Sequence, residues 1–454
     1  MTEPMKGLRP RALPTLAALA AVGFAAAACD NILQVDNPNN VNAEALSNPA
    51  SAANQVNGEL AALTRGANQL VGHIVTASDE LTWSGSLDGI DRLNRGFVRD
   101  PYNEFVNDAV TGMSQARFMA NRTVAQLEKF QAAKTLGDPT QLALANLYAA
   151  ATWDYIANHF DDFVIASEER TAGAAVGPAK MVTLYDSATA AATRGLAIAT
   201  TASTLRGQLR AMRARAKFDR ALWQKLNPSG KAPADPLIAD QGAVDDATAA
   251  IATGLLGNDG RLQLTVVTGM SYGNCFLPSC ANSRREIMFN PTYGAYNYTT
   301  KVLTVNLKDP VSGQPDAALA ALMNEFITGN LLTNLVVTSS RDMRLILAEA
   351  ALAKSDVATF TTQINALRAL SNRPAWSAGG AGMPSARDLL IHERRVNLFL
   401  QGRRLNDMYR FGITDPVWSA QSDAATCPGS ELPIADNERQ ANPNVKDVQP
   451  ACGQ

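Results

Sequence analysis

Long stretches of the chain repeat apolar residues every three or four positions and follow one another with only short breaks. The pattern covers residues 108–132, 140–160, 181–200, 203–226 and 241–253, and alanine, the best helix former, is frequent throughout. Consecutive amphipathic helices with short connections bury their apolar faces against their neighbours in sequence. The pattern therefore predicts a mostly α-helical fold built from stacked helical hairpins.

The pattern changes in the middle of the chain. Between residues 261 and 310, β-branched and aromatic clusters alternate with Gly, Asn, Pro and Ser, which predicts short strands at 264–267, 287–289, 293–298 and 302–305. Helix returns at 342–354 and 357–371 as a helix–turn–helix of tetratricopeptide character. We expect helical repeats over about 105–255 and 340–412, separated by an irregular insert over about 260–335 that carries the short strands.

A last helix is predicted after a capping box at residues 385–388. It should carry Leu389, Val396 and Leu400 on one face. After Trp418 the chain is rich in Pro, Asn, Asp and Gly, which predicts an irregular tail.

The first 28 residues have the pattern of an export signal and not of a folded element. Basic residues open the segment, and residues 15–28 then carry no charge but are too few for the roughly 20 that a spanning helix needs. Small residues lead directly to Cys29, which resembles a bacterial lipobox. That resemblance implies that Cys29 is lipidated and becomes the first residue of a mature domain over 29–454; an ordinary secretory signal is the alternative.

Asp, Asn and Pro dominate the segment directly after Cys29, at residues 30–40, and this composition suits an extended tether. An acyl anchor would hold such a chain firmly, because each buried CH₂ contributes about 0.8 kcal/mol.

The mature chain would keep Cys275, Cys280, Cys427 and Cys452. An even number of cysteines in an exported chain indicates disulfides. Their spacing favours Cys275–Cys280 and Cys427–Cys452, although three pairings are possible. The three histidines are scattered, so neither zinc nor any other metal or cofactor is expected.

Composition excludes other classes of protein. Hydrophobic residues make up 46% of the 454 residues, which is too many for a disordered chain. The 40 basic and 42 acidic residues nearly balance, so the chain has no electrostatic signature of nucleic-acid binding.

One short motif points to a hydrolase. Residues 269–273 read G-x-S-x-G, but a nucleophile elbow must lead directly into a helix. Here the chain continues to Asn274, Cys275 and Pro278, and only His392 lies downstream as a base. We therefore expect no catalytic residues and no enzyme activity.

The segment HERRVNLFLQGRRLNDMYRFG at residues 392–412 resembles the signature ERxxELxxEGxRxxDLxRxG of the SusD/RagB family. The matching positions are Glu393, Arg394, Gly402, Arg404, Asp407, Arg410 and Gly412. Asn397 and Gln401 stand where that family has glutamate, so this helix lacks two carboxylates. The charged run at 393–410 is interpreted as an internal salt-bridge network.

Other segments resemble the same family in the same order: ILQVDNPNN after Cys29, the helix that starts near Leu147, REIMFNP at 285–291, and LILAEAALAKSD with INALRALSNRP before the signature. The resemblance implies tetratricopeptide-like hairpins that cradle an irregular insert. It also implies a surface-exposed outer-membrane lipoprotein that acts as the lid of a SusC-like TonB-dependent transporter and captures oligosaccharides or another nutrient.

Glycan capture uses aromatic faces and polar side chains in loops. Candidate loops are 79–103 and 270–300, and the residues predicted to contact a ligand are Trp83, Arg92, Asn94, Tyr293, Tyr296 and Trp376. Packing is the alternative for Trp83 and for the tyrosine cluster at 293–298. The alternative function is a tetratricopeptide adaptor lipoprotein that binds a protein partner and no small nutrient.

Overall fold

The computed structural model describes residue 2 and residues 43–166, 171–201, 203–252, 256–266, 277–445 and 452–453. The chain divides into two units, residues 1–51 and 52–454. The first contains α2 (Ala43–Ser47) and a 3₁₀ turn, η1 (Pro49–Ser51), where the Asn48 side chain accepts a hydrogen bond from the Ala50 amide at 3.0 Å. All further elements belong to the second unit.

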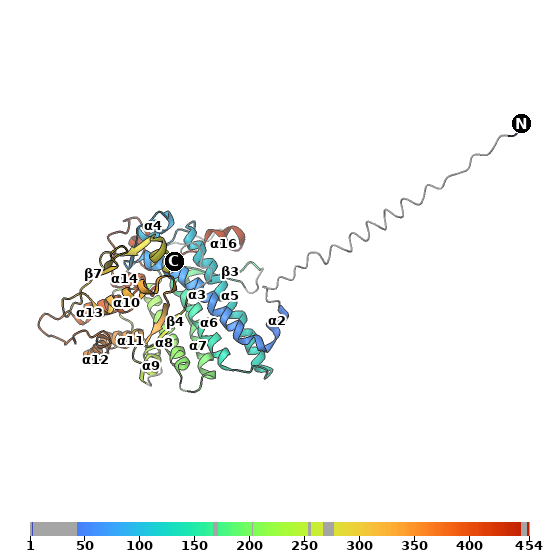
Figure 1. Ribbon diagram of the computed structural model, residues 1–454, viewed down its shortest axis with the longest axis horizontal. Coiled ribbons are helices and arrows are strands. Elements are labelled where there is room, and N and C mark those ends of the chain that lie inside the picture. Colours follow the sequence, from blue (N-terminus) through green and yellow to red (C-terminus); the bar gives the residue numbers. More distant parts are fainter. Residues whose placement is uncertain are drawn as a thin grey trace. The chain divides into compact units, whose positions relative to one another are not determined.

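The predicted run of helices is confirmed. The second unit contains α5 (Glu104–Ala132), α6 (Thr140–His159), α7 (Val182–Ile198), α8 (Thr204–Leu226) and α9 (Gln241–Ala252). Each helix packs against the next, and Figure 1 shows them side by side in sequence order. Side-chain caps begin two of them, because Asn103 accepts from the Phe105 amide and Ser203 accepts from the Arg206 amide.

A long helix that the sequence analysis did not predict, α3 (Ala52–Ala77), packs against both α5 and α6. Glycines let α3 approach α5 closely. A Cβ atom on Gly66 would lie only 2.7 Å from the Gly112 carbonyl oxygen, so a larger residue would push the two helices apart.

The second predicted helix pair is also present, as α11 (Ser340–Ala353) and α12 (Val357–Ala369). Because α11 packs against α8 and α9, the two helical regions form one continuous array (Figure 1). The capping residue Ser385 begins α13 (Ala386–Asn397), as predicted, and accepts a hydrogen bond from the Asp388 amide.

The predicted extension of this helix to Leu400 is wrong. The helix ends at Asn397, Leu400 has a positive φ of 58°, and Gly402 follows with a φ of 71°. The reversal is held by a buried carboxylate, because the Leu400 amide donates to Glu80 Oε1 at 2.7 Å. The chain then enters α14 (Arg404–Phe411).

The insert contains the strands predicted at 287–289, 293–298 and 302–305, and every strand of the described residues lies in a two-stranded antiparallel sheet. The strand predicted at 264–267 is shifted, because β4 overlaps it only at Leu264. β5 (Ile287–Phe289) pairs with β1 (Leu81–Trp83), and β6 (Gly294–Asn297) pairs with β7 (Val302–Val305). β4 (Arg261–Leu264) pairs with β8 (Leu335–Ser339), and β2 (Val164–Ile165) pairs with β3 (Ala174–Ala175). A helix that was not predicted, α10 (Ala317–Gly329), interrupts the insert.

Short elements complete the unit: α4 (Asp88–Asn94), the 3₁₀ turns η2 (Pro178–Lys180) and η4 (Asn330–Leu332), and the π-helical turn η3 (Ser279–Arg284). The tail is less irregular than predicted, because it contains α15 (Asp423–Thr426) and α16 (Asp436–Ala441). Cys427 and Cys452 form a disulfide with a Cα–Cα distance of 5.9 Å. Cys280 is also disulfide-bonded, while Cys275 lies outside the described residues.

Two groups of buried apolar residues form the core. The larger runs along the helical array, and the smaller joins α11, α12 and α13 around Phe360, Ile364 and Leu389. Among the described helices, none combines the length and the apolar character that crossing a membrane requires.

Candidate functional site

The two loops in which ligand contacts were predicted come together through the β1–β5 ladder. In this ladder Thr82 lies opposite Met288 and Trp83 opposite Ile287. Beyond the ladder the Glu286 carboxylate accepts hydrogen bonds from the backbone amides of Ser86 at 2.7 Å and Leu87 at 3.1 Å. Segments about 200 residues apart in sequence therefore form one surface.

The two faces of this ladder have different surroundings. Ile287 is buried and Trp83 packs partly against the core, whereas Met288 is 46% exposed. Successive side chains of a strand point to opposite faces, so Thr82 and Met288 lie on the outer face and Trp83 on the inner one.

The outer face borders a cleft of about 690 Å³, which we call the signature cleft. Its walls come from β1, from the segment after β5, from α13 and α14, and from the loop after α14. The lining residues are Asp79, Thr82, Asn290, Pro291, Thr292, Asp388, Ile391, His392, Arg395, Arg404, Ile413, Thr414, Asp415, Pro416 and Val417. Both predicted loops thus meet the helices of the signature segment at this cleft.

A charged cluster lies at the base of the signature cleft. Arg404 donates two hydrogen bonds to Asp79, at 2.7 and 2.8 Å, and Tyr293 donates a third to the same carboxylate at 2.8 Å. Arg395 lies 3.3 Å from Asp79 and stacks over the Tyr293 ring, with its guanidinium carbon 4.1 Å from the ring centroid. Burial alone would raise the pKa of Asp79, but Arg404, Arg395 and the Tyr293 hydroxyl outweigh it and lower the pKa. Asp79 is therefore ionised at neutral pH.

Several polar groups of this cluster have spare hydrogen-bonding capacity. Arg395 Nε and Arg404 Nη1 are buried and have no partner in the described part of the chain. Burial raises the pKa of Asp415, on the opposite wall. Buried donors without partners are rare in native structures and call for water or a ligand. The cleft can thus offer donors and acceptors beside the aliphatic side chains of its rim.

The predicted ligand contacts fall into two groups. Asn94, Tyr293 and Trp376 are only 6%, 0% and 3% exposed. A solute cannot reach these three side chains in this structure, so we assign them to packing. Trp376, for example, donates to the Pro384 carbonyl at 3.0 Å and packs edge-on against Phe360.

The other predicted contacts are accessible in part. Arg92 pairs with Asp100 at 2.8 Å and keeps 39% of its side chain exposed. Trp83 is partly buried, and its Nε1 is buried without a partner among the described residues. Because Trp83 faces away from Thr82, it does not line the signature cleft.

A second exposed feature, the tyrosine face, consists of Tyr296, Tyr298 and Arg285. The two rings meet edge to face with centroids 4.8 Å apart, as their period-two spacing predicts. Arg285 lies over the Tyr298 ring with its guanidinium carbon 4.4 Å from the centroid. Both tyrosines keep partial exposure, so they offer aromatic surface to a solute.

Sequence reasoning missed most of the residues that line the signature cleft. Thr82, Asn290 and Thr292 have no distinctive motif, and Arg395 was assigned only to the charged run. The strand pattern at 287–289 was a usable signal, because it indicates that Met288 faces outward while its neighbours face the core.

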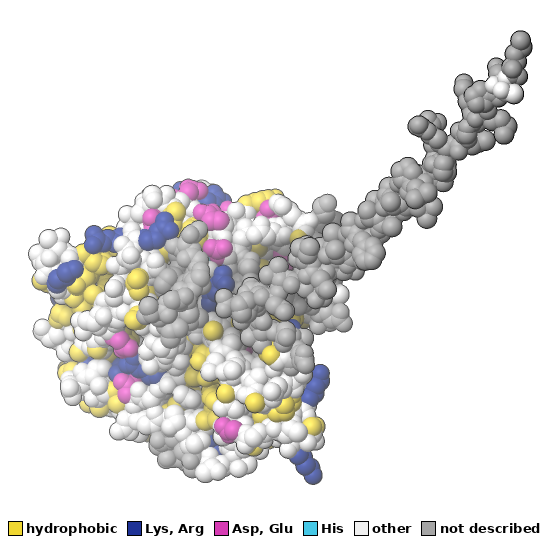
Figure 2. Space-filling view, turned by 45° about the vertical axis from the view of Figure 1, so that its right-hand side comes forward, with side chains coloured by type: hydrophobic (Ala, Val, Ile, Leu, Met, Phe, Trp, Pro, Cys, Tyr) yellow, Lys and Arg dark blue, Asp and Glu magenta, His cyan; other side chains and the backbone are white. Residues whose placement is uncertain are grey.

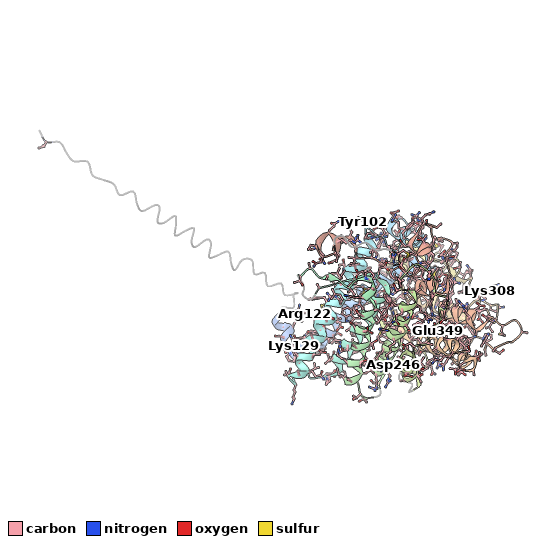
Figure 3. All side chains as sticks on the ribbon, turned by 180° about the vertical axis from the view of Figure 1, so that it is seen from behind. Tyr102, Arg122, Lys129, Asp246, Lys308 and Glu349 are labelled. Atoms are coloured by element: carbon pink, nitrogen blue, oxygen red, sulfur yellow. A yellow bond between two sulfur atoms is a disulfide. The ribbon has the colours of Figure 1, made fainter. Side chains whose placement is uncertain are left out.

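The charged run of the signature segment forms an internal ion-pair network, as predicted. Arg394 lies 2.9 Å from Asp407, and Arg410 lies 2.8 Å from the same carboxylate and also pairs with Glu349. Figure 3 labels Glu349, which is fully buried. Burial would raise the pKa of Asp407, but Arg394 and Arg410 outweigh it and lower the pKa to about 2. The network therefore specifies packing and leaves no free charge for a ligand at Asp407.

Asn397, where the family signature has glutamate, is also part of the network. Its amide nitrogen donates to Glu393 Oε2 at 3.0 Å, and its oxygen accepts from Arg341 at 2.9 Å. Glu393 in turn pairs with Arg368 at 2.6 Å and Arg373 at 2.5 Å. The neutral amide thus bridges a buried carboxylate and a buried guanidinium.

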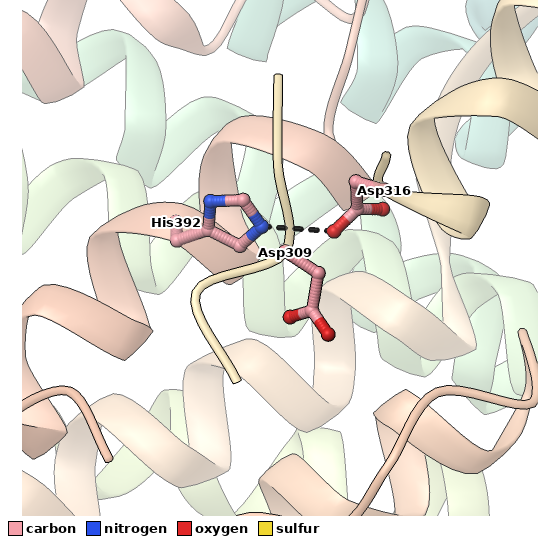
Figure 4. A group of neighbouring side chains, drawn as sticks. All are labelled: Asp309, Asp316 and His392. Atoms are coloured by element: carbon pink, nitrogen blue, oxygen red, sulfur yellow. Dashed lines mark hydrogen bonds and ion pairs between the residues drawn. The ribbon is translucent and has the colours of Figure 1, made fainter. Parts of the chain in front are cut away.

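One group of side chains in the described part of the chain has the composition of a metal site. Ligand atoms of Asp309, Asp316 and His392 lie within 4.8 Å of one another (Figure 4). However, Arg368 makes two hydrogen bonds of 2.9 Å to Asp309, and Arg373 makes one of 2.9 Å to Asp316. Two guanidinium groups already balance these carboxylates, so the group is better described as an ion-pair cluster.

Two further predictions lie outside the described residues. These are the lipidation of Cys29 and the interpretation of the G-x-S-x-G motif at 269–273 as a non-catalytic segment.

Charge is distributed evenly over the visible surface. Figure 2 shows basic and acidic side chains interspersed on the described part of the face that it draws. This agrees with the near-zero net charge of the sequence.

No family model and no curated protein sequence matches the chain. Solved structures do. A SusD superfamily protein from Bacteroides thetaiotaomicron is similar with a TM-score of 0.60 and 14% identity, over 87% of this chain and 98% of that chain. A putative sugar binding protein from Bacteroides vulgatus is similar with a TM-score of 0.55 and 14% identity, over 87% of this chain and 97% of that chain. A SusD-like carbohydrate binding protein from the same species is similar with a TM-score of 0.53 and 13% identity, over 89% of this chain and 98% of that chain.

Proposed function

We propose that this chain, which has the SusD-like fold, is a non-enzymatic lipoprotein that captures a glycan at the signature cleft. The single observation that carries the proposal is the composition of this cleft: a charged base with unpaired buried donors beside an aliphatic rim. Two proteins of the same fold bear names that describe sugar or carbohydrate binding, which supports this choice of ligand.

The cleft has groups that complement a saccharide. A sugar hydroxyl both donates and accepts hydrogen bonds, while the C–H groups of the ring are apolar. Arg395 and Arg404 can donate, Asp415 can accept, and Ile391 and Val417 can contact the ring faces. The volume of about 690 Å³ lies within the range of small-ligand sites.

The wider role that we propose is supported by the export signal and by the resemblance of the sequence to the SusD/RagB family. Cys29 would carry acyl chains, and residues 30–40 would tether the folded unit to the outer membrane. We propose that the protein faces the cell surface and works as the lid of a SusC-like TonB-dependent transporter, to which it delivers the captured glycan. A tethered lid must be able to swing, and the Asn- and Pro-rich segment after Cys29 is suited to this.

The test is a binding screen of the purified protein against a panel of soluble polysaccharides and oligosaccharides, with isothermal titration of every hit. We expect Arg395→Gln to weaken binding of the confirmed glycan roughly tenfold, because one charged hydrogen bond contributes about 1.5–3 kcal/mol. The matched control is Arg122→Gln, an exposed substitution on α5 that should not change affinity.

Two results would contradict the proposal. One is an unchanged affinity of Arg395→Gln for the confirmed glycan, which would place the site elsewhere. The other is the release of new reducing ends during prolonged incubation, which would show an enzyme.

The adaptor function has one observation in its favour. A groove of about 540 Å³ between α9, α11 and α12 has apolar side chains such as Val244, Ile251 and Leu347. Arg344 lines it and has a buried Nε without a partner in the described chain. An adaptor would bind no glycan in the screen, and Leu347→Arg would abolish its co-purification with its protein partner.

A further inference from the structure

A second cleft, separate from the signature cleft, has one wall formed by α3 and α5 and another formed by the β2–β3 hairpin. Its volume is about 520 Å³. The residues that matter for its chemistry are Ala62, Arg117, Phe118, Met119, Val164 and Glu438. We call it the Arg117 cleft.

The central feature of this cleft is a buried cation without a counter-ion. Arg117 is only 6% exposed, and it has no hydrogen bond or ion pair with any part of the chain that the structure describes. Burial lowers its pKa, since no carboxylate offsets the loss of solvation. The guanidinium nevertheless stays charged, because its unperturbed pKa is above about 12.

Other buried arginines of the described residues are paired. Arg215 lies 2.7 Å from Asp154, Arg368 lies 2.9 Å from Asp309, and Arg410 pairs with Glu349. A buried charge without a partner is unfavourable, so a guanidinium that no described residue pairs with is suited to a ligand of opposite charge.

Glu438 does not provide the missing partner. It lines the same cleft, but its side chain accepts from the Asn442 amide group at 2.7 Å and makes no ion pair with Arg117. The cleft therefore contains two opposite charges that do not neutralise each other, with apolar side chains beside them.

We propose that the Arg117 cleft binds a small organic carboxylate with an apolar body. The planar guanidinium matches a carboxylate and can bind it through two parallel hydrogen bonds. Phe118, Met119 and Val164 provide apolar contacts for the rest of the molecule. One cation and one carboxylate line the cleft, which favours a monoanion over a phosphate. Glu438 can accept a hydrogen bond from an amino group, so an α-amino acid fits the same chemistry.

The test uses aliphatic and aryl monocarboxylates, each with its neutral primary amide, titrated into the purified protein. The amino acid L-phenylalanine, its deamino analogue 3-phenylpropanoate and the amine phenethylamine form one matched set. We expect at least one carboxylate to bind, and its primary amide to bind at least roughly tenfold more weakly, since loss of a charged hydrogen bond has about that effect. Binding of both acids of the matched set, or of the deamino acid alone, supports the proposal.

Two variants on α5 link the binding to Arg117. Arg117→Met keeps the length of the side chain and should abolish carboxylate binding, while its melting temperature stays equal or rises, because a buried unpaired charge has been removed. Lys129→Met, at an exposed position near the end of the same helix (Figure 3), should bind like the wild type.

Three results would overturn the proposal: no carboxylate binds, the amine binds while the acids do not, or Arg117→Met keeps the affinity. A markedly lower melting temperature of Arg117→Met would also overturn it, because it would show that the guanidinium is a structural group. The glycan site is tested separately, since Arg395→Gln should leave carboxylate binding unchanged.

Discussion

The Arg404 side chain makes a two-point contact with Asp79, a residue 325 positions earlier in the chain, with hydrogen bonds of 2.7 and 2.8 Å. Asp79 lies directly after α3 and Arg404 begins α14, so this pair joins the first long helix of the main unit to its signature segment. Both side chains are largely buried and line the signature cleft. The pair therefore supports the fold and also shapes the candidate site.

Replacing Arg404 should destabilise the protein strongly. Arg404→Met would leave the buried Asp79 carboxylate with only Arg395 and Tyr293, and removal of one partner of a buried ion pair costs about 3–5 kcal/mol. The free energy of unfolding, measured by urea denaturation at pH 7, checks this. Lys129→Met, at an exposed position on α5, is the control and should change it by less than about 0.5 kcal/mol. Equal effects of the two variants would contradict the importance of the pair.

Replacing the neighbouring residue Glu80 should stabilise the protein at high pH, whereas replacing Arg404 destabilises it. Burial is the main cause that raises the pKa of Glu80 to about 8, although the hydrogen bond from the Leu400 amide lowers it. The folded state thus keeps a proton that the unfolded chain, with a pKa of about 4.3, releases. Stability should therefore fall as the pH rises from about 4.5 to 8.

Glu80→Gln removes this titration and keeps an oxygen that can accept from Leu400. We expect the variant to match the wild type near pH 4 and to be more stable by at least about 1 kcal/mol at pH 8. Urea denaturation across this range measures the difference. A variant that is less stable at pH 8 would show that the carboxylate is needed in its ionised form.

The stability of the protein should depend on a neutral amide at Asn397, next to the Glu393 carboxylate. Asn397→Asp keeps the shape but places a carboxylate where the amide nitrogen now lies 3.0 Å from Glu393 Oε2. The new carboxyl group should have a raised pKa because of the like charge, so it destabilises most at neutral pH. We expect a loss of about 2–4 kcal/mol at pH 7 that shrinks as the pH falls towards about 4, because the folded state takes up the proton before the unfolded chain, whose Asp pKa is about 3.9. The exposed Asn437→Asp should show no such pH dependence, and a constant loss at every pH would contradict the mechanism.

Much of the helical fold was predictable because its signals are local. The periodicity between residues 104 and 252 placed five helices with small errors at their ends, and Ser385 marked the start of α13. The end of α13 was not predictable in the same way. Leu400 continues the apolar pattern, but the amide of Leu400 binds Glu80, and this distant contact decides the backbone conformation.

The candidate site was harder to predict from the sequence than the helices, because distant contacts decide which side chains line it. The sequence named residues 79–103 and 270–300 as candidate loops because both are polar and contain aromatic residues, and β1 and β5, which lie within them, pair in the structure. Which side chains face the cleft is decided by the pairing of β1 with β5, and no local pattern near Trp83 specifies Ile287 as its partner. For the same reason the sequence could not show that Tyr293 is buried under Arg395.

Trp83 and Tyr296 should respond differently to substitution. Trp83 lies on the inner face of β1, so Trp83→Ala should lower the free energy of unfolding by about 2 kcal/mol or more and change glycan affinity little. Tyr296 belongs to the exposed tyrosine face and does not line the signature cleft, so Tyr296→Ala should weaken binding only of a glycan long enough to extend beyond the cleft, with a smaller loss of stability. Titration of the confirmed glycan and urea denaturation of both variants give the answer. A large loss of affinity in Trp83→Ala alone would return Trp83 to the binding site.

Membrane attachment should depend on Cys29. Cys29→Ser cannot be acylated, and without acyl chains the anchor loses about 0.8 kcal/mol for every CH₂ that was buried in the bilayer. Cells labelled with an alkyne fatty acid should show a labelled wild-type band in the membrane fraction, and an unlabelled Cys29→Ser band that no longer sediments with membranes. Cys427→Ser is the matched control, because Cys427 forms a disulfide with Cys452 and should not affect labelling. An unlabelled wild type would show an ordinary secretory signal, and the tethered lid would then be the wrong description of the protein; label that persisted in Cys29→Ser would place the acyl group on another residue.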